Sequence, residues 1–229
     1  MGTGERMTLD VEGRRVSALL DHAAERVALA VLAHGAGVPM THPFMAGAAA
    51  GLVAGGVSAL RFNFVYAEAG RRAPDRAPLL QAACRAALAE AVRQAGAGPR
   101  SLPIVAAGKS LGGRMLSLLA AEDGEAFPAR AVVFLGYPLH APGRFEVPRD
   151  AHLERVAVPM LFVQGTNDAL ARFDLIEALV ARLGSRARLH AVEGGDHSFE
   201  VRGRPRPDEE AGREVGAVAA AFVREVVGA

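Results

Sequence analysis

The feature of this chain that most constrains its fold is the alternation of unbroken apolar runs with stretches of helical hydrophobic spacing. An apolar run without polar interruption is typical of a strand that is buried on both faces, as in a parallel sheet. Strands that alternate with helices predict right-handed crossovers and a doubly wound sheet. We expect six such strands, over residues 27–33, 57–64, 102–107, 131–135, 160–163 and 188–192.

Helical spacing falls between these runs and after the last of them. We expect helices over residues 44–54, 79–94, 112–122, 171–183 and 209–227. The amino-terminal part differs, because two short strand-like segments, 7–12 and 16–21, flank a turn at Gly13 and predict an antiparallel hairpin. The predicted fold class is therefore α/β, with a mostly parallel, doubly wound sheet and an N-terminal hairpin.

Length and composition are consistent with a single domain over residues 1–229, since α/β folds reach about 200–250 residues without dividing. Lys and Arg number 26 against 25 Asp and Glu, so the formal charge of +1 gives no electrostatic argument for a nucleic-acid partner. Cys84 is the only cysteine, and its place within the helical spacing of 79–94 predicts a buried, unreactive side chain. The sequence does not predict the oligomeric state.

The chain is expected to be cytoplasmic. Glu5 and Arg6 stand where a signal peptide would need apolar residues. Residues 43–60 carry no charge, but Gly55-Gly56 divides this segment into a predicted helix and a strand, so we expect no membrane span. Lys109 is the only lysine, and the richness in Arg, Ala and Gly is typical of a GC-rich, bacterial genome.

Residues 108–112, Gly-Lys-Ser-Leu-Gly, fit the nucleophile-elbow pattern Gly-x-Ser-x-Gly. A predicted strand leads into this motif and a predicted helix follows it, which is the strand-turn-helix context that the elbow requires. Glycines allow the strand and helix to pass close together at the sharp turn. We therefore expect Ser110 to be a nucleophile; a simple helix-capping serine is the alternative.

A serine hydroxyl needs a base to remove its proton and a third group to orient that base. In this kind of fold the order along the chain is Ser, then Asp or Glu, then His. Asp168 follows the strand 160–163, and His197 follows the last strand on a glycine-rich turn. Asp196 is the alternative acid, although adjacent side chains diverge. His190 lies within the last strand, where we expect it to be packed.

The segment 34–37, His-Gly-Ala-Gly, directly follows the first predicted parallel strand. A glycine-flanked loop there can direct the backbone N–H of Ala36 into the site, where it would form an oxyanion hole with the N–H of Leu111. Lys109, beside the predicted nucleophile, has two interpretations. We expect a structural ammonium with an acidic or carbonyl partner, and the alternative is electrostatic help to the oxyanion.

Six motifs taken together resemble a dienelactone-hydrolase-like branch of the α/β-hydrolases, which also resembles the hydrolase-like domain of subunit 3 of the metazoan NSL chromatin complex. They are 31–37 (Val-Leu-Ala-His-Gly-Ala-Gly), 61–64 (Arg-Phe-Asn-Phe), 108–115 (Gly-Lys-Ser-Leu-Gly-Gly-Arg-Met), 135–140 (Leu-Gly-Tyr-Pro-Leu-His), 164–168 (Gln-Gly-Thr-Asn-Asp) and 194–199 (Gly-Gly-Asp-His-Ser-Phe). The resemblance implies an α/β-hydrolase fold. Val65 departs from the proline expected in this branch, and Ser110 argues against true dienelactone hydrolase activity, which uses cysteine.

The predicted function is hydrolysis of a small ester-type substrate through an acyl-enzyme on Ser110, without a metal or an organic cofactor. A catalytically idle interaction protein is the alternative, and a peptidase is a further one. The segment 139–159 contains three prolines and lacks helical spacing, so we expect at most a short helical turn and no cap domain. We expect residues 66–78 to form a loop. Ser110 should then lie in a shallow, open cleft rimmed by Tyr66, Met115, Leu139 and His140.

Overall fold

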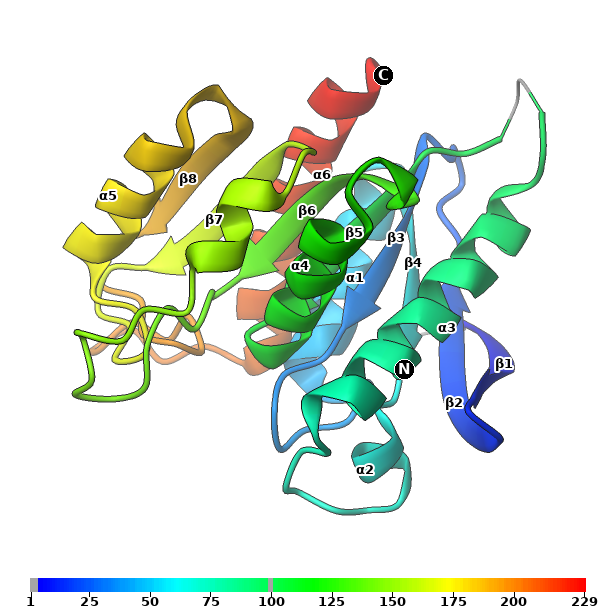
Figure 1. Cartoon of the computed structure of the whole chain (residues 1–229), viewed down its shortest axis with the longest axis horizontal. Coiled ribbons are helices and arrows are strands. Elements are labelled where there is room, and N and C mark those ends of the chain that lie inside the picture. The colour runs from blue at the N-terminus through cyan, green and yellow to red at the C-terminus, as the bar shows by residue number, and fades with distance from the viewer. Residues whose placement is uncertain (1–3, 99–100) are drawn as a thin grey trace.

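The computed structural model describes residues 4–98 and 101–229; residues 1–3 and 99–100 of the predicted domain lie outside the described residues. Its centre is a single sheet, which is drawn in Figure 1 with helices in front of it and behind it. The strands of this sheet are β1 (Glu5–Val11), β2 (Arg14–Asp21), β3 (Ala28–Ala33), β4 (Val57–Phe62), β5 (Ile104–Lys109), β6 (Ala129–Leu135), β7 (Met160–Gly165) and β8 (Ala187–Val192).

The strand order is β1-β2-β4-β3-β5-β6-β7-β8. β1 and β2 form an antiparallel hairpin, and β2 continues antiparallel to β4, whereas all pairs from β4 to β8 are parallel. Every residue of β3, β4, β5 and β7 is buried, as the unbroken apolar runs predict. The chain adds β4 on one side of β3 and then crosses to β5 on the other, so the loops after β3 and β5 meet at the carboxyl edge of the sheet.

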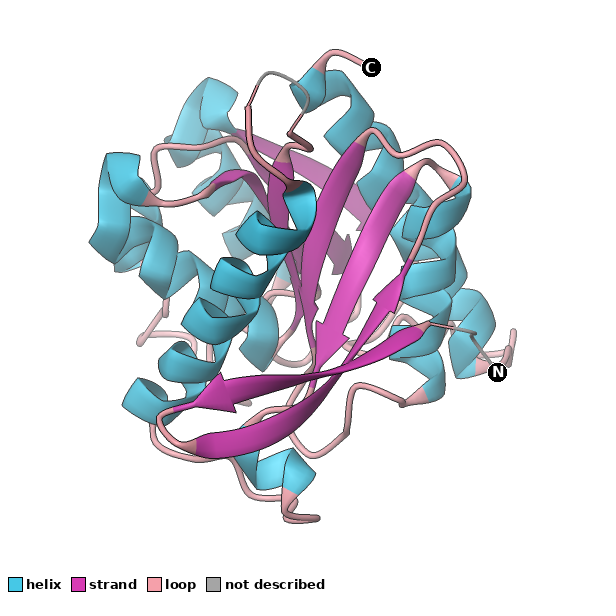
Figure 2. Ribbon diagram, turned by 90° about the vertical axis from the view of Figure 1, so that its right-hand side faces the viewer, coloured by secondary structure: helices cyan, strands magenta, loops and turns pink. Residues whose placement is uncertain are grey.

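Helices cover both faces of the sheet, and Figure 2 shows the sheet between them. α1 and α6 pack with one cluster of buried residues, and α3, α4 and α5 pack with the other. The α-helices are α1 (Pro43–Ala54), α2 (Val65–Glu68), α3 (Ala77–Ala95), α4 (Leu111–Asp123), α5 (Phe173–Leu183) and α6 (Asp208–Val227). Short 3-10 helices cover Gly124–Ala126, Ala151–Arg155 and Gly184–Arg186. Cys84 is buried in α3, as predicted.

α1 and α6 lie against each other through glycines. A Cβ added to Gly51 of α1 would lie 2.3 Å from the carbonyl oxygen of Arg213, and one added to Gly216 of α6 would lie 2.3 Å from that of Ala48. Because both approaches involve backbone atoms, the helices would have to separate to admit a side chain. This close packing explains why the uncharged segment 43–60 is rich in small residues. It forms α1 and most of β4, and within 4–98 and 101–229 no helix is long and apolar enough to cross a membrane.

Two sequence-based expectations need correction. The segment 66–78 is not entirely a loop, because α2 occupies its start and α3 begins at Ala77 with Pro78 in the first turn, where its missing N–H costs nothing. His190 is exposed rather than packed, because β8 is an edge strand that pairs only with β7. The expectation for 139–159 is correct, since the residues Ala151–Arg155 form the one short helix described there.

The contact between α1 and α6 gives a stability prediction. Gly216→Val should lower Tm by about 2–12 °C, since overpacking costs about 1–3 kcal/mol and each kcal/mol shifts Tm by about 2–4 °C in a domain of this size. Ala217→Val is the matched control, because it adds a β-branched side chain at an exposed position of the same helix. Thermal unfolding followed by circular dichroism measures both variants. Equal shifts would contradict the role of the glycine contact.

Candidate functional site

Ser110 lies at the turn between β5, which ends at Lys109, and α4, which begins at Leu111. Its backbone has φ 48° and ψ −111°, a conformation that residues other than glycine rarely adopt. Such a backbone costs of the order of 1–3 kcal/mol and persists only where the surrounding structure holds it in place. The turn presents the Ser110 side chain at the carboxyl edge of the sheet, as the elbow pattern predicts.

The glycines of the motif allow this turn to form. A Cβ at Gly108 would lie 2.2 Å from the backbone nitrogen of Gly113, and one at Gly112 would lie 2.5 Å from the carbonyl oxygen of Ala33. Both distances are far inside van der Waals contact with backbone atoms. β3, β5 and the first turn of α4 therefore approach one another as closely as their backbones permit.

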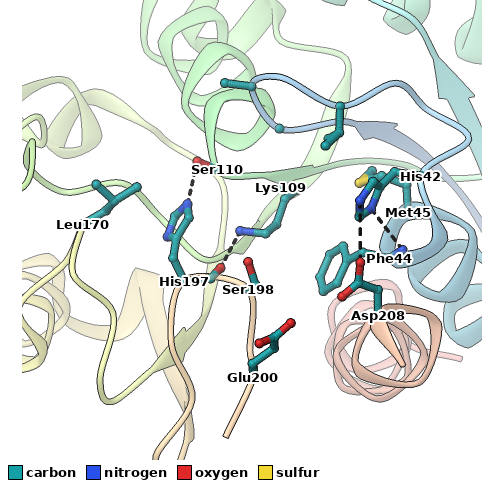
Figure 3. A pocket seen from close by; sticks show the side chains of 13 residues that line it. His42, Phe44, Met45, Lys109, Ser110, Leu170, His197, Ser198, Glu200 and Asp208 are labelled. Carbon is teal, nitrogen blue, oxygen red and sulfur yellow. Dashed lines mark hydrogen bonds and ion pairs between the residues drawn. The ribbon is translucent and has the colours of Figure 1, made fainter. Parts of the chain in front are cut away.

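Ser110, His197 and Asp168 are brought together by the fold. The Nε2 atom of His197 lies 2.9 Å from Ser110 Oγ, and its Nδ1 atom lies 2.7 Å from Asp168 Oδ2. Figure 3 shows the imidazole turned toward the serine. This chain of hydrogen bonds has the geometry in which an imidazole can accept the serine proton while a carboxylate fixes its tautomer.

Asp168 is buried and held by further donors. The side-chain nitrogen of Gln164 donates to Oδ2 at 2.5 Å, and the backbone N–H of Leu170 donates to Oδ1 at 2.7 Å. Burial without such donors would disfavour a carboxylate strongly. Gln164 lies near the end of β7. Apart from its place in the motif 164–168, nothing in the sequence indicated that it would bind Asp168.

Asp196, the alternative acid, has a different position. Its Oδ1 atom accepts hydrogen bonds from the backbone N–H groups of Ser198 and Glu200, at 2.8 and 2.9 Å. These bonds shape the turn that carries His197, and Phe199 in the same turn has a positive φ of 66°. The carboxylate that contacts the imidazole is therefore that of Asp168.

Lys109 is buried beneath the site. Its Nζ donates to the carbonyl oxygen of His197 at 2.7 Å and lies 5.8 Å and 5.5 Å from the ring centroids of Phe44 and Phe199. Burial lowers the pKa of the Lys109 ammonium to about 8, and the charges of Asp168 and Asp196 act in the opposite direction. A carbonyl partner agrees with the structural interpretation, but the sequence gave no indication that this carbonyl belongs to His197.

The predicted oxyanion-hole residues also lie at this edge. Gly35 and Ala36 line the cleft in front of Ser110, and a Cβ on Gly35 would lie 3.8 Å from that of Ser110. Leu111 is the first residue of α4, so its N–H has no partner within the helix. Ala36, in the loop after β3, and Leu111, at the start of α4, therefore flank Ser110 on two sides.

The cleft at Ser110 has a volume of about 380 Å³. It extends from the serine toward the start of α1, where Figure 3 shows Phe44, Met45 and His42. His42 caps α1 through Nδ1, which accepts from the N–H of Phe44, and its Nε2 lies 3.6 Å from Asp208 of α6. The lining comprises Gly35, Ala36, Val38, His42, Phe44, Met45, Lys109, Ser110, Leu170, His197, Ser198, Glu200 and Asp208.

None of the four residues that we expected to rim this cleft lines it. Tyr66, Met115, Leu139 and His140 are all buried. The phenol of Tyr66 turns inward to the carbonyl of Gly35, and His140 Nε2 accepts from the backbone N–H of Arg172. Met115 belongs to the core because α4, which begins directly after Ser110, packs on the sheet.

The sequence-based reasoning missed the true walls of the cleft at α1 and at the start of α6. A usable signal existed for α1, since a helix that follows the loop after β3 begins at the same sheet edge as Ser110. Asp208 gave no such signal, because its approach depends on how α6 packs on α1. In the described ranges, no group of three or more His, Cys, Asp or Glu side chains is placed to hold a metal ion.

Comparisons with known proteins agree with this architecture. The sequence model of the family described as "Alpha/beta hydrolase domain" matches residues 26–225. A serine hydrolase homologue from Coxiella burnetii superposes with a TM-score of 0.74 at 19% identity, covering 96% of this chain and 98% of its own. A dienelactone hydrolase from Anabaena variabilis gives 0.70 at 21% identity, covering 97% of each chain. A serine hydrolase without a lid from Xanthomonas campestris gives 0.70 at 18%, covering 98% and 94%.

At these identities the likeness to solved structures shows the fold alone. Together with the family match, it confirms the fold class predicted from the sequence, an α/β-hydrolase fold with an N-terminal antiparallel hairpin and no separate cap domain in the described residues.

The bond from Lys109 to the His197 carbonyl gives a second stability prediction. Lys109→Met should lower Tm by about 2–12 °C, because a partly buried carbonyl left without its donor costs about 1–3 kcal/mol and each kcal/mol shifts Tm by about 2–4 °C. Amide exchange in residues 194–200 should become faster as the turn loosens. Arg130→Met, which removes an exposed cation, is the control and should change neither measurement. Unchanged exchange in Lys109→Met would show that the ammonium does not hold this turn.

Proposed function

The chain belongs to the α/β-hydrolase domain family, and we propose that it is a serine hydrolase that cleaves small ester-type substrates, carboxylic esters or thioesters. The observation that carries this proposal is the chain of hydrogen bonds from Asp168 through His197 to Ser110 at a strained elbow open to a cleft. An elbow kept in a costly backbone conformation is typical of functional sites.

In the proposed reaction, His197 Nε2 takes the proton of Ser110 as Oγ attacks the carbonyl carbon of the ester. Asp168 holds the Nδ1 proton and stabilises the imidazolium that forms. The backbone N–H groups of Ala36 and Leu111 donate to the oxyanion of the tetrahedral intermediate. The imidazolium then protonates the departing alcohol or thiol. Water, activated by the same base, releases the acid from the acyl-enzyme.

The cleft supports a small substrate. Its apolar lining, which includes Phe44, Met45 and Leu170, can accommodate a short acyl or aryl group beside the serine. Between β6 and β7, where a cap could be inserted, the described chain has only the 3-10 helix Ala151–Arg155. A long acyl chain would therefore remain largely in water and gain little from burial.

The narrower resemblance, to the dienelactone-hydrolase-like branch that also resembles the hydrolase-like domain of NSL subunit 3, stays a prediction from the six sequence motifs. That branch supplies the alternative function, an interaction protein without activity. The experiment below distinguishes the two.

Ser110→Ala tests the nucleophile. A fluorophosphonate probe should label the wild-type protein and not the variant, because the probe reacts with an activated serine hydroxyl. Ser117→Ala is a matched control, since Ser117 is a buried serine of α4 outside the cleft, and this variant should still be labelled. Circular dichroism checks that both variants fold. A wild-type protein that resists labelling would favour the interaction protein.

The roles of the two aspartates are tested by amide substitutions. Asp168→Asn should reduce kcat on p-nitrophenyl acetate by about 10⁴-fold, because the amide favours the wrong imidazole tautomer. Asp196→Asn should have a much smaller effect, since its carboxylate caps a turn. Steady-state kinetics at equal folded concentration measures both, and the reverse ranking would exchange the roles.

The open cleft predicts a preference for short acyl chains. The value of kcat/KM on p-nitrophenyl esters should be highest for acetate or butyrate, since chain atoms that stay in water do not gain the roughly 0.8 kcal/mol per CH₂ of burial. No interfacial activation should occur, because no cap has to open. Rates that rise through dodecanoate, or a jump above the critical micelle concentration of the substrate, would contradict the open site.

A further inference from the structure

The peptide group that joins Gly35 to Ala36 lies at the wall of the cleft beside Ser110, and its carbonyl oxygen is held by two buried side chains. His34 Nδ1 lies 2.7 Å from this oxygen, and the phenol of Tyr66 donates to it at 3.1 Å. Both side chains have no exposed surface. The segment 34–37 and the segment 63–66 thus converge on one backbone carbonyl.

The tautomer of His34 follows from its other neighbour. Its Nε2 atom lies 3.1 Å from the backbone nitrogen of Phe64, whose N–H is a donor. Nε2 must therefore accept, so Nδ1 carries the ring proton and donates to the Gly35 oxygen. Burial lowers the pKa of His34 to about 4, while the bond to Gly35 acts in the opposite direction. The ring is thus neutral at physiological pH and keeps this tautomer.

The two donors fix the direction of the next N–H. A trans peptide is planar, so the C=O of Gly35 and the N–H of Ala36 point to opposite sides of the same rigid group. No cis peptide occurs in the described residues. When the carbonyl is held in the interior, the N–H of Ala36 is directed outward, on the side where the cleft lies. Donors on the carbonyl also polarise the amide and strengthen its N–H as a donor.

We propose that His34 and Tyr66 are positioning residues for the oxyanion hole: they hold the Gly35 carbonyl so that the Ala36 N–H is aimed at the oxyanion that forms on the Ser110 adduct. This inference rests on the serine hydrolase function proposed above. It assigns Tyr66 a role in catalysis that acts through the backbone and not through contact with substrate.

Packing fixes the two side chains in the orientation that this role requires. The ring of His34 packs edge-on against those of Phe64 and Tyr66, with centroids 4.8 Å and 5.8 Å apart, and Tyr66 stacks on Phe64 at 6.1 Å. Burying a polar group is unfavourable unless it is hydrogen-bonded. The polar atoms of this aromatic cluster are bonded to backbone groups, and two of those bonds go to a single carbonyl.

The chain offers a matched pair of variants, because it contains two tyrosines, both fully buried and both donating to a backbone carbonyl. The phenol of Tyr137 donates to Arg149. Tyr66→Phe and Tyr137→Phe should therefore shift Tm similarly. Tyr66→Phe should lower kcat on p-nitrophenyl acetate about tenfold with KM changed less than twofold, a smaller loss than removal of an oxyanion donor causes. Tyr137→Phe should retain kcat within about twofold.

A transition-state analogue gives an independent measurement. A phenylboronic acid forms a tetrahedral adduct with the serine and places an oxygen in the oxyanion hole, so Tyr66→Phe should weaken its inhibition about tenfold. Equal kcat and equal boronate inhibition for the two tyrosine variants would overturn the proposal, because a purely structural hydroxyl would affect both variants alike.

His34 provides a second pair in case Tyr66→Phe does not fold. The side-chain amide nitrogen of Asn can take the place of Nδ1 and donate to the carbonyl of Gly35. The side-chain amide of Gln reaches the place of Nε2, where its oxygen can accept only from the N–H of Phe64. His34→Asn should therefore keep more activity per folded molecule than His34→Gln. The reverse ranking would overturn the proposal.

Failure of the underlying function has a different signature. If the wild-type protein shows no Ser110-dependent hydrolysis or labelling, the proposed function is wrong and the positioning role falls with it. If wild-type activity depends on Ser110 and yet the tyrosine variants have equal kcat, the function stands and the positioning role is wrong.

Discussion

The close crossing of β5 and α4 at Ser110 is the constraint on which the rest of the site depends. The left-handed backbone of this serine is costly, and it persists because Gly108 and Gly112 let two strands and a helix pack backbone against backbone. This packing also sets the neighbours of the serine. β3 lies directly beside β5, so the loop after β3 reaches the elbow. β7 lies two strands from β5 on the other side, and the loop after β7 brings Asp168 to His197.

Around this crossing, polar side chains bind backbone groups of the loops that approach Ser110. Lys109 holds the carbonyl of His197 from below, and Asp196 caps the turn that carries the same histidine. In the loop after β3, His34 and Tyr66 bind the carbonyl of Gly35. For the buried side chains Lys109, His34 and Tyr66, these hydrogen bonds replace the hydration that is lost on burial. These hydrogen bonds connect the loops around Ser110 to side chains that lie at the carboxyl edge of the sheet.

Much of the fold and part of the site follow from local sequence pattern. The strands β3 to β8 and the five longer helices were predicted within a few residues, since burial on both faces imposes unbroken apolar runs and crossover helices impose periodic spacing. The walls of the cleft were not predicted. Tyr66 and His140 carry polar atoms and stand near the motifs, yet both are turned inward, while Phe44 and Asp208 face the cleft from helices that the sequence marks only as amphipathic or small-residue segments.

By itself, the sequence determined the doubly wound sheet, the elbow at Ser110, and the order in which Asp168 and His197 follow it, because each is encoded in residues close together in the chain. The sequence favoured Asp168 over Asp196, and the structure shows the contact of Asp168 with the imidazole. The tertiary structure alone decided which carbonyl receives the ammonium of Lys109 and which side chains line the cleft. These outcomes depend on distances between segments as far apart in the chain as those of His42 and Asp208. Such distances are set by the angle and distance at which helices pack on the sheet, and the hydrophobic periodicity of a sequence does not predict these two quantities.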